Sequence, residues 1–256
     1  MIAPSGEQHE LVLGDSRVVV VEVGAGLREW DGVLVGYGVD EMCGAGRGQV
    51  LAPWPNRIEG GSYEWDGERQ QLPIDETSTG SAIHGLARWA SWRLVERESA
   101  RAVLEYVLHP QPGYPFVLRL RVEYRLGDSG LVVRTTAENV GDRACPFGAG
   151  HHPYLAAPTG RVDDLVLDSG QIGDRRLDET WHRPGGWRID LGEAVVWADA
   201  SWPCIQVFTG DLPEIARRGL AVEPMTCPPQ AFRTGEGLIR LEPGETFSGE
   251  WGIDPA

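Results

Sequence analysis

The sequence predicts an all-β protein, a large antiparallel two-sheet β-sandwich, and three observations carry that prediction. Apolar and charged residues alternate through one long stretch, whose apolar members are Phe116, Leu118, Leu120, Val122 and Tyr124. This period of two residues is that of a strand with one buried face. No window of twelve or more residues shows the 3.6-residue period of an amphipathic helix. The 34 glycines and 18 prolines are spread along the chain, where they separate strands.

Turn residues divide the chain into the expected strands. Gly14-Asp15-Ser16 separates the first two, Asp66-Gly67 is a strong hairpin signal, and Gly127–Gly130 follows the alternating stretch. The expected strands span residues 11–13, 18–23, 33–37, 62–65, 68–72, 92–96, 102–108, 116–124, 131–139, 194–198, 205–209, 219–223, 238–241 and 246–252. Residues 58–75, around the second hairpin, and 156–188 are the least regular parts. We expect them to lie over the sheets as loops.

Length, charge and cysteine content narrow the class of protein. We expect a single domain, residues 1–256, because all-β domains reach this size whole and no linker or repeat interrupts the chain. The net charge of −15 argues against nucleic acid and anionic membranes as partners. The four cysteines form no CxxC pair, so zinc and redox motifs lack support. The sequence has no signal peptide pattern and no long apolar run, so we expect a cytoplasmic protein. We expect it to be a monomer or a homodimer.

The stretch Ala221–Phe232 contains the first candidate functional residue. Glu223 ends an apolar run and precedes Pro224, which fixes the backbone. A carboxylate in such a place is costly to ionise, so its pKa is expected to rise. A raised pKa suits a general base that works near neutral pH. A structural ion pair with an arginine is the alternative reading.

Three further stretches place polar residues among turn-formers and aromatics. The first is Pro53–Ile58, in which two prolines precede Arg57, a planar donor. The second is Ala82–Trp89, in which His84 precedes a glycine that permits close approach of a ligand. In the third, Gly148–Tyr154, the neighbouring residues His151 and His152 point to opposite faces of an extended chain. Only one of them is expected to face a site, so the two are not expected to share a metal ion, and we expect no metal.

These residues suit proton transfer on a polar, uncharged substrate. The set contains a glutamate, histidines and an arginine, and the chain has no glycine-rich phosphate loop and no nucleophile signature. We therefore expect no cofactor. Three aromatic residues are expected to offer flat faces to a sugar ring: Trp54, Trp89 and Tyr154.

Four of these motifs together resemble the aldose 1-epimerases, also called galactose mutarotases. They are, in the family's order, Pro53-Trp-Pro-Asn-Arg-Ile, Ala82-Ile-His-Gly-Leu-Ala-Arg-Trp, His152-Pro-Tyr and Val222-Glu-Pro-Met-Thr-Cys-Pro-Pro. The resemblance covers nearly the whole chain. It implies a galactose mutarotase-like supersandwich, and an isomerase that interconverts the α and β anomers of a free hexose.

The resemblance also implies a role for each matching residue. Glu223 matches the general base that takes the proton of the C1 hydroxyl, and His152 matches the general acid that protonates the ring oxygen. His84 and Arg57 match substrate-binding residues. The expected sugar contacts further include Asn56, Trp89 and Tyr154.

One region departs from the family pattern. The chain is short between Asp164 and Glu193, where the family usually has a longer segment leading to an aspartate that holds a sugar hydroxyl. Asp178 is the best match for that aspartate, and its rivals are Asp168, Asp174 and Asp190.

Three other functions remain open at this point. A non-catalytic sugar-binding or regulatory protein could use the same fold, and loss of the role of Asp178 would favour it. A hexose-phosphate epimerase would need a basic cluster near the site, and the overall acidity argues against one. A glycosidase would need two carboxylates, but only Glu223 has a motif-like setting.

Overall fold

The alternating stretch forms the strand β11 (Leu118–Gly127). The computed structural model, which describes residues 2–167 and 170–255, pairs β11 along its length with β12 (Gly130–Asn139). The apolar residues of β11 are buried, whereas its arginines face outward and form ion pairs. Arg121 Nε, for example, lies 2.8 Å from Glu105 Oε2. The predicted strand and its two faces are confirmed.

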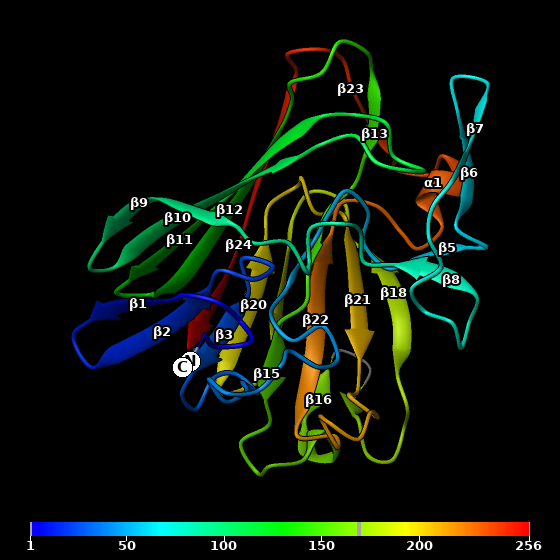
Figure 1. Ribbon diagram of the computed structural model, residues 1–256. Coiled ribbons are helices and arrows are strands. Elements are labelled where there is room, and N and C mark those ends of the chain that lie inside the picture. Colours follow the sequence, from blue (N-terminus) through cyan, green and yellow to red (C-terminus); the bar gives the residue numbers. More distant parts are fainter. Residues whose placement is uncertain (1, 168–169, 256) are drawn as a thin grey trace.

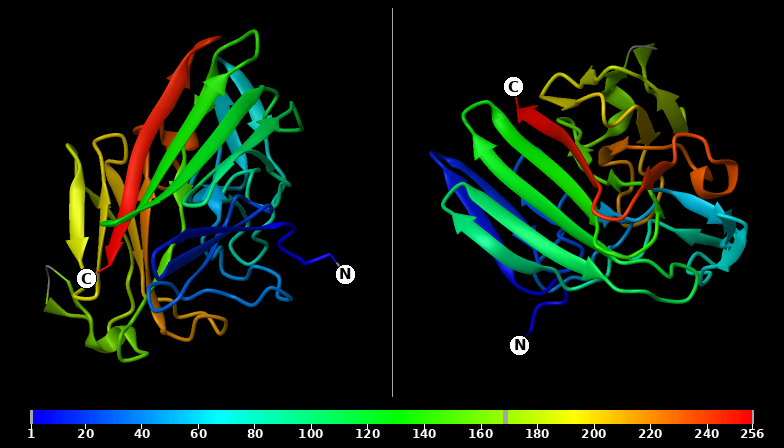
Figure 2. Two further views of the ribbon diagram at one scale, coloured as in Figure 1. Left: turned by 90° about the vertical axis from the view of Figure 1, so that its left-hand side faces the viewer. Right: turned by 90° about the horizontal axis from the view of Figure 1, so that it is seen from above.

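This hairpin lies in a seven-stranded antiparallel sheet, one of two large sheets (Figure 1). Its strands are, in spatial order, β19 (Trp187–Asp190), β20 (Ala194–Ala198), β24 (Thr246–Pro255), β12, β11, β10 (Arg101–Leu108) and β9 (Arg93–Glu98). A three-stranded sheet packs against β10 and β11 and consists of β1 (Gln8–Leu13), β2 (Ser16–Val21) and β3 (Leu27–Trp30). Figure 2 shows this small sheet facing the curved larger one.

The second large sheet carries the residues of the candidate site. Its strands are, in spatial order, β18 (Asp178–His182), β21 (Cys204–Phe208), β22 (Gly219–Met225), β14 (Gly150–His151) and β4 (Val50–Leu51), and β15 (Tyr154–Ala156) also pairs with β22. Every residue of β22 is buried. One hydrophobic cluster contains residues of both large sheets, including Val133 of β12 and Val222 of β22. The two-sheet β-sandwich predicted from the sequence is therefore confirmed.

Short elements complete the described chain. Paired strands are β5 (Arg57–Glu59) with β8 (Ser81–Ile83), β6 (Ser62–Trp65) with β7 (Glu68–Gln71), β13 (Cys145–Phe147) with β23 (Ile239–Leu241), and β16 (Val166–Leu167) with β17 (Gly170–Gln171). The helical elements are η1 (Val162–Asp164) and α1 (Ala231–Thr234). Neither of these described helices is long and apolar enough to cross a bilayer.

Some of the predicted turns and loops differ from those in the structure. The turns at Gly14-Asp15 and Asp66-Gly67 do form hairpins. Residues 33–37 are not a strand, because the N–H of Leu34 bonds back to the carbonyl of Trp30 and closes a turn. The expectation that residues 58–75 and 156–188 are loops was also wrong in part. Besides the predicted β6–β7 hairpin, these regions contain β5, β16, β17 and β18, and β18 is an exposed edge strand whose apolar alternation is weak.

Candidate active site

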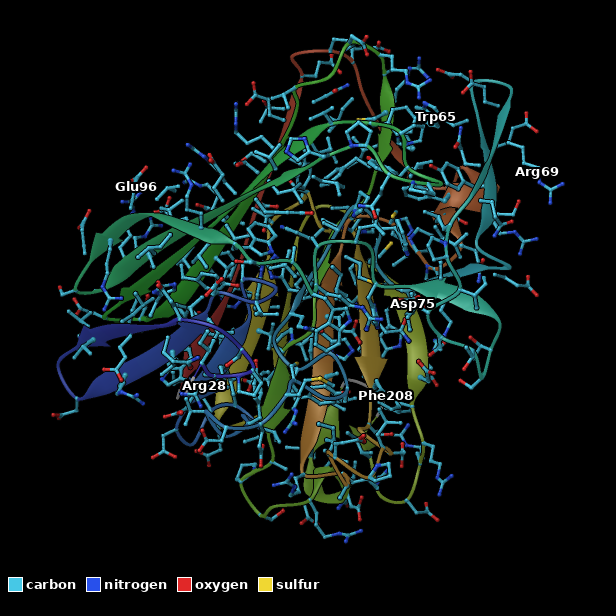
Figure 3. All side chains as sticks on the ribbon, viewed as in Figure 1. Arg28, Trp65, Arg69, Asp75, Glu96 and Phe208 are labelled. Atoms are coloured by element: carbon cyan, nitrogen blue, oxygen red, sulfur yellow. The ribbon has the colours of Figure 1, made fainter. Side chains whose placement is uncertain are left out.

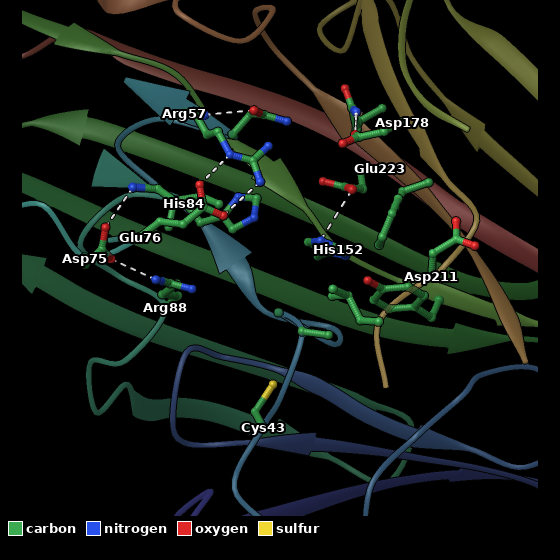
Figure 4. A pocket seen from close by; sticks show the side chains of 18 of the residues that line it. Cys43, Arg57, Asp75, Glu76, His84, Arg88, His152, Asp178, Asp211 and Glu223 are labelled. Carbon is green, nitrogen blue, oxygen red and sulfur yellow. Dashed lines mark hydrogen bonds and ion pairs between the residues drawn. The ribbon is translucent and has the colours of Figure 1, made fainter. Parts of the chain in front are cut away.

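Glu223 lies on the central strand β22 and lines a pocket of about 480 Å³ on one face of the six-stranded sheet (Figure 4). The residue is 2% exposed, and its Oε2 has no hydrogen-bond partner among the described residues. Burial raises the pKa of the Glu223 carboxyl well above its ordinary value, and the charge of Asp178 raises it further. Both effects favour the protonated form of the Glu223 carboxyl group.

His152 faces Glu223 across the pocket. Its Nε2 lies 3.4 Å from Glu223 Oε1, and its Nδ1 is buried without a partner among the residues that the structure describes. Burial lowers the pKa of His152 to about 3. Glycine at position 46 leaves room for this imidazole, because a Cβ there would lie 2.9 Å from His152 Cδ2. The two groups that the resemblance pairs as base and acid are neighbours in space.

The preceding histidine points the other way, as expected for extended chain. His151 Nε2 lies 2.7 Å from Thr135 Oγ1 of the seven-stranded sheet. Its ring packs between Trp202 and Trp251, with centroid distances of 5.6 and 5.0 Å. Of the two adjacent histidines, only His152 lines the pocket.

His84 is brought to the pocket by an unusual backbone conformation. It has a φ of +62°, and the following Gly85 has a φ of +74°. A side chain at Gly85 is excluded, because a Cβ there would lie 2.1 Å from the carbonyl oxygen of Ala52. The His84 ring meets the edge of the His152 ring at a centroid distance of 5.3 Å. Burial lowers the pKa of His84 well below its ordinary value, so the imidazole is neutral.

Two arginines in the pocket are each held by an acidic residue of one loop. Arg57 donates from Nε and Nη2 to both oxygens of Glu76, at 2.6 and 2.8 Å. Arg88 donates from Nη2 to Asp75 Oδ2 at 2.7 Å. Sequence reasoning missed both acids: Asp75 ends the region expected to be an irregular loop, and Glu76 follows directly after it.

Asp178 begins the edge strand β18 and is held by its neighbour on β21. Gln206 donates from Nε2 to Asp178 Oδ1 at 2.5 Å and accepts from the Thr180 hydroxyl at 2.5 Å. In the pairing of β21 with β22, Gln206 stands opposite Glu223. Gln206 was also missed, although a buried polar residue within the predicted strand 205–209 was a signal for it.

The aromatic residues differ in how they meet the pocket. Trp89 is 47% exposed at its rim, and Tyr154 is buried with its ring stacked on His152 at 5.0 Å. The Tyr154 hydroxyl has no hydrogen-bond partner in the described structure. The expectation for Trp54 was wrong, because this residue is buried in the core against Phe232 and does not line the pocket.

The pocket brings together the residues predicted as a site from five distant stretches of sequence. Its lining includes Asn56, Arg57, His84, Trp89, His152, Tyr154, Asp178 and Glu223. Asn56 has a φ of +51° and its Oδ1 accepts from the N–H of Arg57. Asp174 and Asp190 lie outside the lining, and Asp168 lies outside the described residues. Within residues 2–167 and 170–255, no group of three or more ligand-type side chains is placed to hold a metal ion.

The sequence matches one family model, described as aldose 1-epimerase, over residues 9–168. The chain is 36% identical to the uncharacterized protein YihR of Escherichia coli K12, with 94% of this chain and 91% of YihR aligned. It is 26% identical to the uncharacterized protein YphB of the same organism, with 79% and 81% of the two chains aligned.

Solved structures share the fold at low sequence identity. A GalM/aldose epimerase homologue from Caenorhabditis elegans superposes with a TM-score of 0.81 at 15% identity and 98% coverage of both chains. A galactose 1-epimerase from Lactobacillus acidophilus gives 0.75 at 17% identity, covering 96% of this chain and 94% of the other. These likenesses confirm the galactose mutarotase-like fold.

Proposed function

This chain belongs to the aldose 1-epimerase family, and we propose that it interconverts the α and β anomers of a free hexose. The observation that carries the proposal is the buried pair of Glu223 and His152, whose Oε1 and Nε2 atoms are 3.4 Å apart. Anomerisation moves protons at two oxygens bonded to the same sugar carbon, the C1 hydroxyl and the ring oxygen. An acid and a base side by side suit that requirement.

The proposed cycle uses only the protons held by this pair. Glu223 takes the proton of the C1 hydroxyl while His152 gives one to the ring oxygen, and the C1–O bond of the ring breaks. The open aldehyde rotates about its C1–C2 bond. The reverse transfers then close the ring on the other face of C1 and return each group to its starting state. No cofactor is needed, because no electrons leave or enter the sugar.

Burial opposes the charged forms of both groups, so the empty pocket favours one proton on Glu223 and a neutral His152. The cycle needs the same proton on His152. We expect a bound sugar to drive that transfer, since a C1 hydroxyl that donates to the unpartnered Glu223 Oε2 stabilises the carboxylate. Either arrangement keeps one donor and one acceptor in the pair.

The surrounding residues are proposed to hold the sugar. His84 and Arg57 offer donors near the pair, and Asp178 offers an acceptor at the edge strand. Asn56 and Tyr154 add polar groups, and Trp89 offers an aromatic face at the rim. A mostly preformed pocket with a few fixed polar groups is typical of small-molecule sites.

Polarimetry tests the proposal. Freshly dissolved α-glucose or α-galactose should approach its equilibrium rotation faster in proportion to protein concentration. Glu223→Gln should abolish most of that acceleration, since an amide of the same shape cannot accept the proton. Glu138→Gln is the matched control, because Glu138 pairs with Arg119 on the outer face of the seven-stranded sheet. A wild-type protein that accelerates neither sugar contradicts the proposal for those sugars, and a fully active Glu223→Gln contradicts the role of Glu223.

A further inference from the structure

We propose that Asp75 and Glu76 are specificity-determining residues that restrict the pocket to sugars without an acidic substituent. The inference rests on the proposed function and names its substrate class. Neither residue belongs to the set that the sequence motifs single out. Both lie on the loop before β8 and line the pocket beside the proposed acid–base pair (Figure 4).

Glu76 saturates one edge of the Arg57 guanidinium group. The two parallel hydrogen bonds, of 2.6 and 2.8 Å, form the geometry in which arginine otherwise binds a carboxylate or phosphate ligand. The hydroxyl of Thr79 donates to Glu76 as well, which fixes the carboxylate. The anion-binding edge of Arg57 is therefore already occupied by the protein.

Asp75 pairs with Arg88 through a single hydrogen bond, and Arg88 Nε is buried without a partner among the described residues. One of the Asp75 oxygens accepts from Arg88 Nη2 at 2.7 Å, and the other accepts from the backbone N–H of Ile83 at 2.8 Å. The Arg88 side chain is 13% exposed, so this ion pair is partly shielded from water. The N–H of Ile83 lies next to His84, so the same contact ties the loop to the segment that carries the histidine.

The charge of the lining follows from these pairs. The described lining contains five carboxylic acids and two guanidinium groups. Asp75 and Glu76 pair with the two guanidinium groups, Asp211 pairs with Arg217 outside the lining, and Glu223 favours its protonated form, which leaves the charge of Asp178 unbalanced. The histidines His84 and His152 are neutral in the empty pocket. An anionic sugar would enter a site with excess negative charge, within a chain whose net charge is −15.

A neutral sugar does not meet this barrier. A guanidinium group has five N–H donors, and Glu76 uses two of those of Arg57. The remaining donors suit the lone pairs of hydroxyl or ring oxygens. A carboxylate or phosphate on the sugar would instead have to displace Glu76 and leave that acid unpaired, which is the kind of penalty that builds specificity against a competitor.

The test compares a neutral sugar with its acid. We measure anomer exchange at equilibrium by NMR for glucose and glucuronate, and take the ratio of kcat/KM for the two sugars. Wild type should favour glucose, and Glu76→Gln should shift the ratio toward glucuronate by about tenfold, because a charge-assisted hydrogen-bonding edge of Arg57 is freed. Glu59→Gln is the matched control. It removes the same charge from strand β5, but Glu59 pairs with Arg233 and does not line the pocket.

Each outcome bears on the proposal. A ratio in Glu76→Gln that equals those of wild type and Glu59→Gln overturns it, as does a wild type that favours glucuronate. If Glu76→Gln does not fold, Asp75→Asn makes the same test at Arg88, because the asparagine oxygen can still accept from Ile83.

A protein that accelerates neither sugar would contradict the proposed function without deciding the charge selection. Line broadening of glucuronate and glucose signals by the protein then decides it. Stronger glucuronate binding by Glu76→Gln than by Glu59→Gln supports the inference, and equal binding overturns it.

Discussion

His151 and His152 are neighbours in the chain and are both buried, yet they belong to different parts of the molecule. His151 faces the core between the packed sheets. Thr135 hydrogen-bonds one of its ring nitrogens, and two tryptophans pack against the ring. His152 faces the pocket, where its Nε2 lies near Glu223 and its Nδ1 has no partner within the described part of the chain. In the core, His151 Nε2 has a hydrogen-bond partner, whereas in the pocket His152 Nδ1 and Glu223 Oε2 have none among the described residues. Those incomplete contacts are where a substrate gains its hydrogen bonds.

The largest effect on catalysis should come from His152. Replacing it with asparagine removes the proposed acid, and we expect the rate of anomer exchange to fall by about 10²–10⁴-fold. Thermal stability should change little, because His152 makes few bonds that the fold depends on. NMR exchange spectroscopy measures the rate of anomer exchange, and circular dichroism measures the melting temperature. A large loss of stability with full activity would reverse the roles we assign to the two histidines.

His151 should show the opposite pattern. His151→Ala leaves a cavity against Trp202 and Trp251 and an unpaired Thr135 hydroxyl, which together should cost about 2–4 kcal/mol in the free energy of unfolding. Urea denaturation measures that cost. The folded fraction should keep a kcat close to that of wild type. A rate loss comparable to that of His152→Asn would contradict the separation of core and pocket.

A smaller and pH-dependent effect should distinguish Glu223 from ordinary carboxyl groups. Burial raises its pKa in the folded protein well above the ordinary value of 4.5. Below pH 4.5 both states carry the proton, and as pH rises the unfolded state ionises first. Wild type should therefore lose stability relative to Glu223→Gln with rising pH, by about 1.4 kcal/mol for each unit of pKa difference.

Urea denaturation of both proteins at several pH values measures this difference. A stability difference that does not change with pH would mean that Glu223 is ionised in the folded protein at no cost. That result would contradict the uncharged pair.

Sequence patterns located the fold and the centre of the site but not its surroundings. The alternation around Leu120 predicted β11, since one face is apolar throughout. Motif order placed Glu223 and His152 in one pocket before the structure did. Asp75, Glu76 and Gln206 escaped, because their roles depend on partners far along the chain, such as Arg57 and Asp178. Trp54 was misassigned, since an aromatic beside prolines looks the same whether it packs inward or meets a ligand.

The central claim is that Glu223 and His152 work as one proton-sharing unit. A double-mutant cycle of Glu223→Gln and His152→Asn, read as the rate of glucose anomer exchange by NMR, tests it most directly. If the two act as a unit, the double variant should be about as slow as the slower single variant, because either change alone breaks the transfer. Rate losses that multiply in the double variant would show two independent contributions and contradict the account.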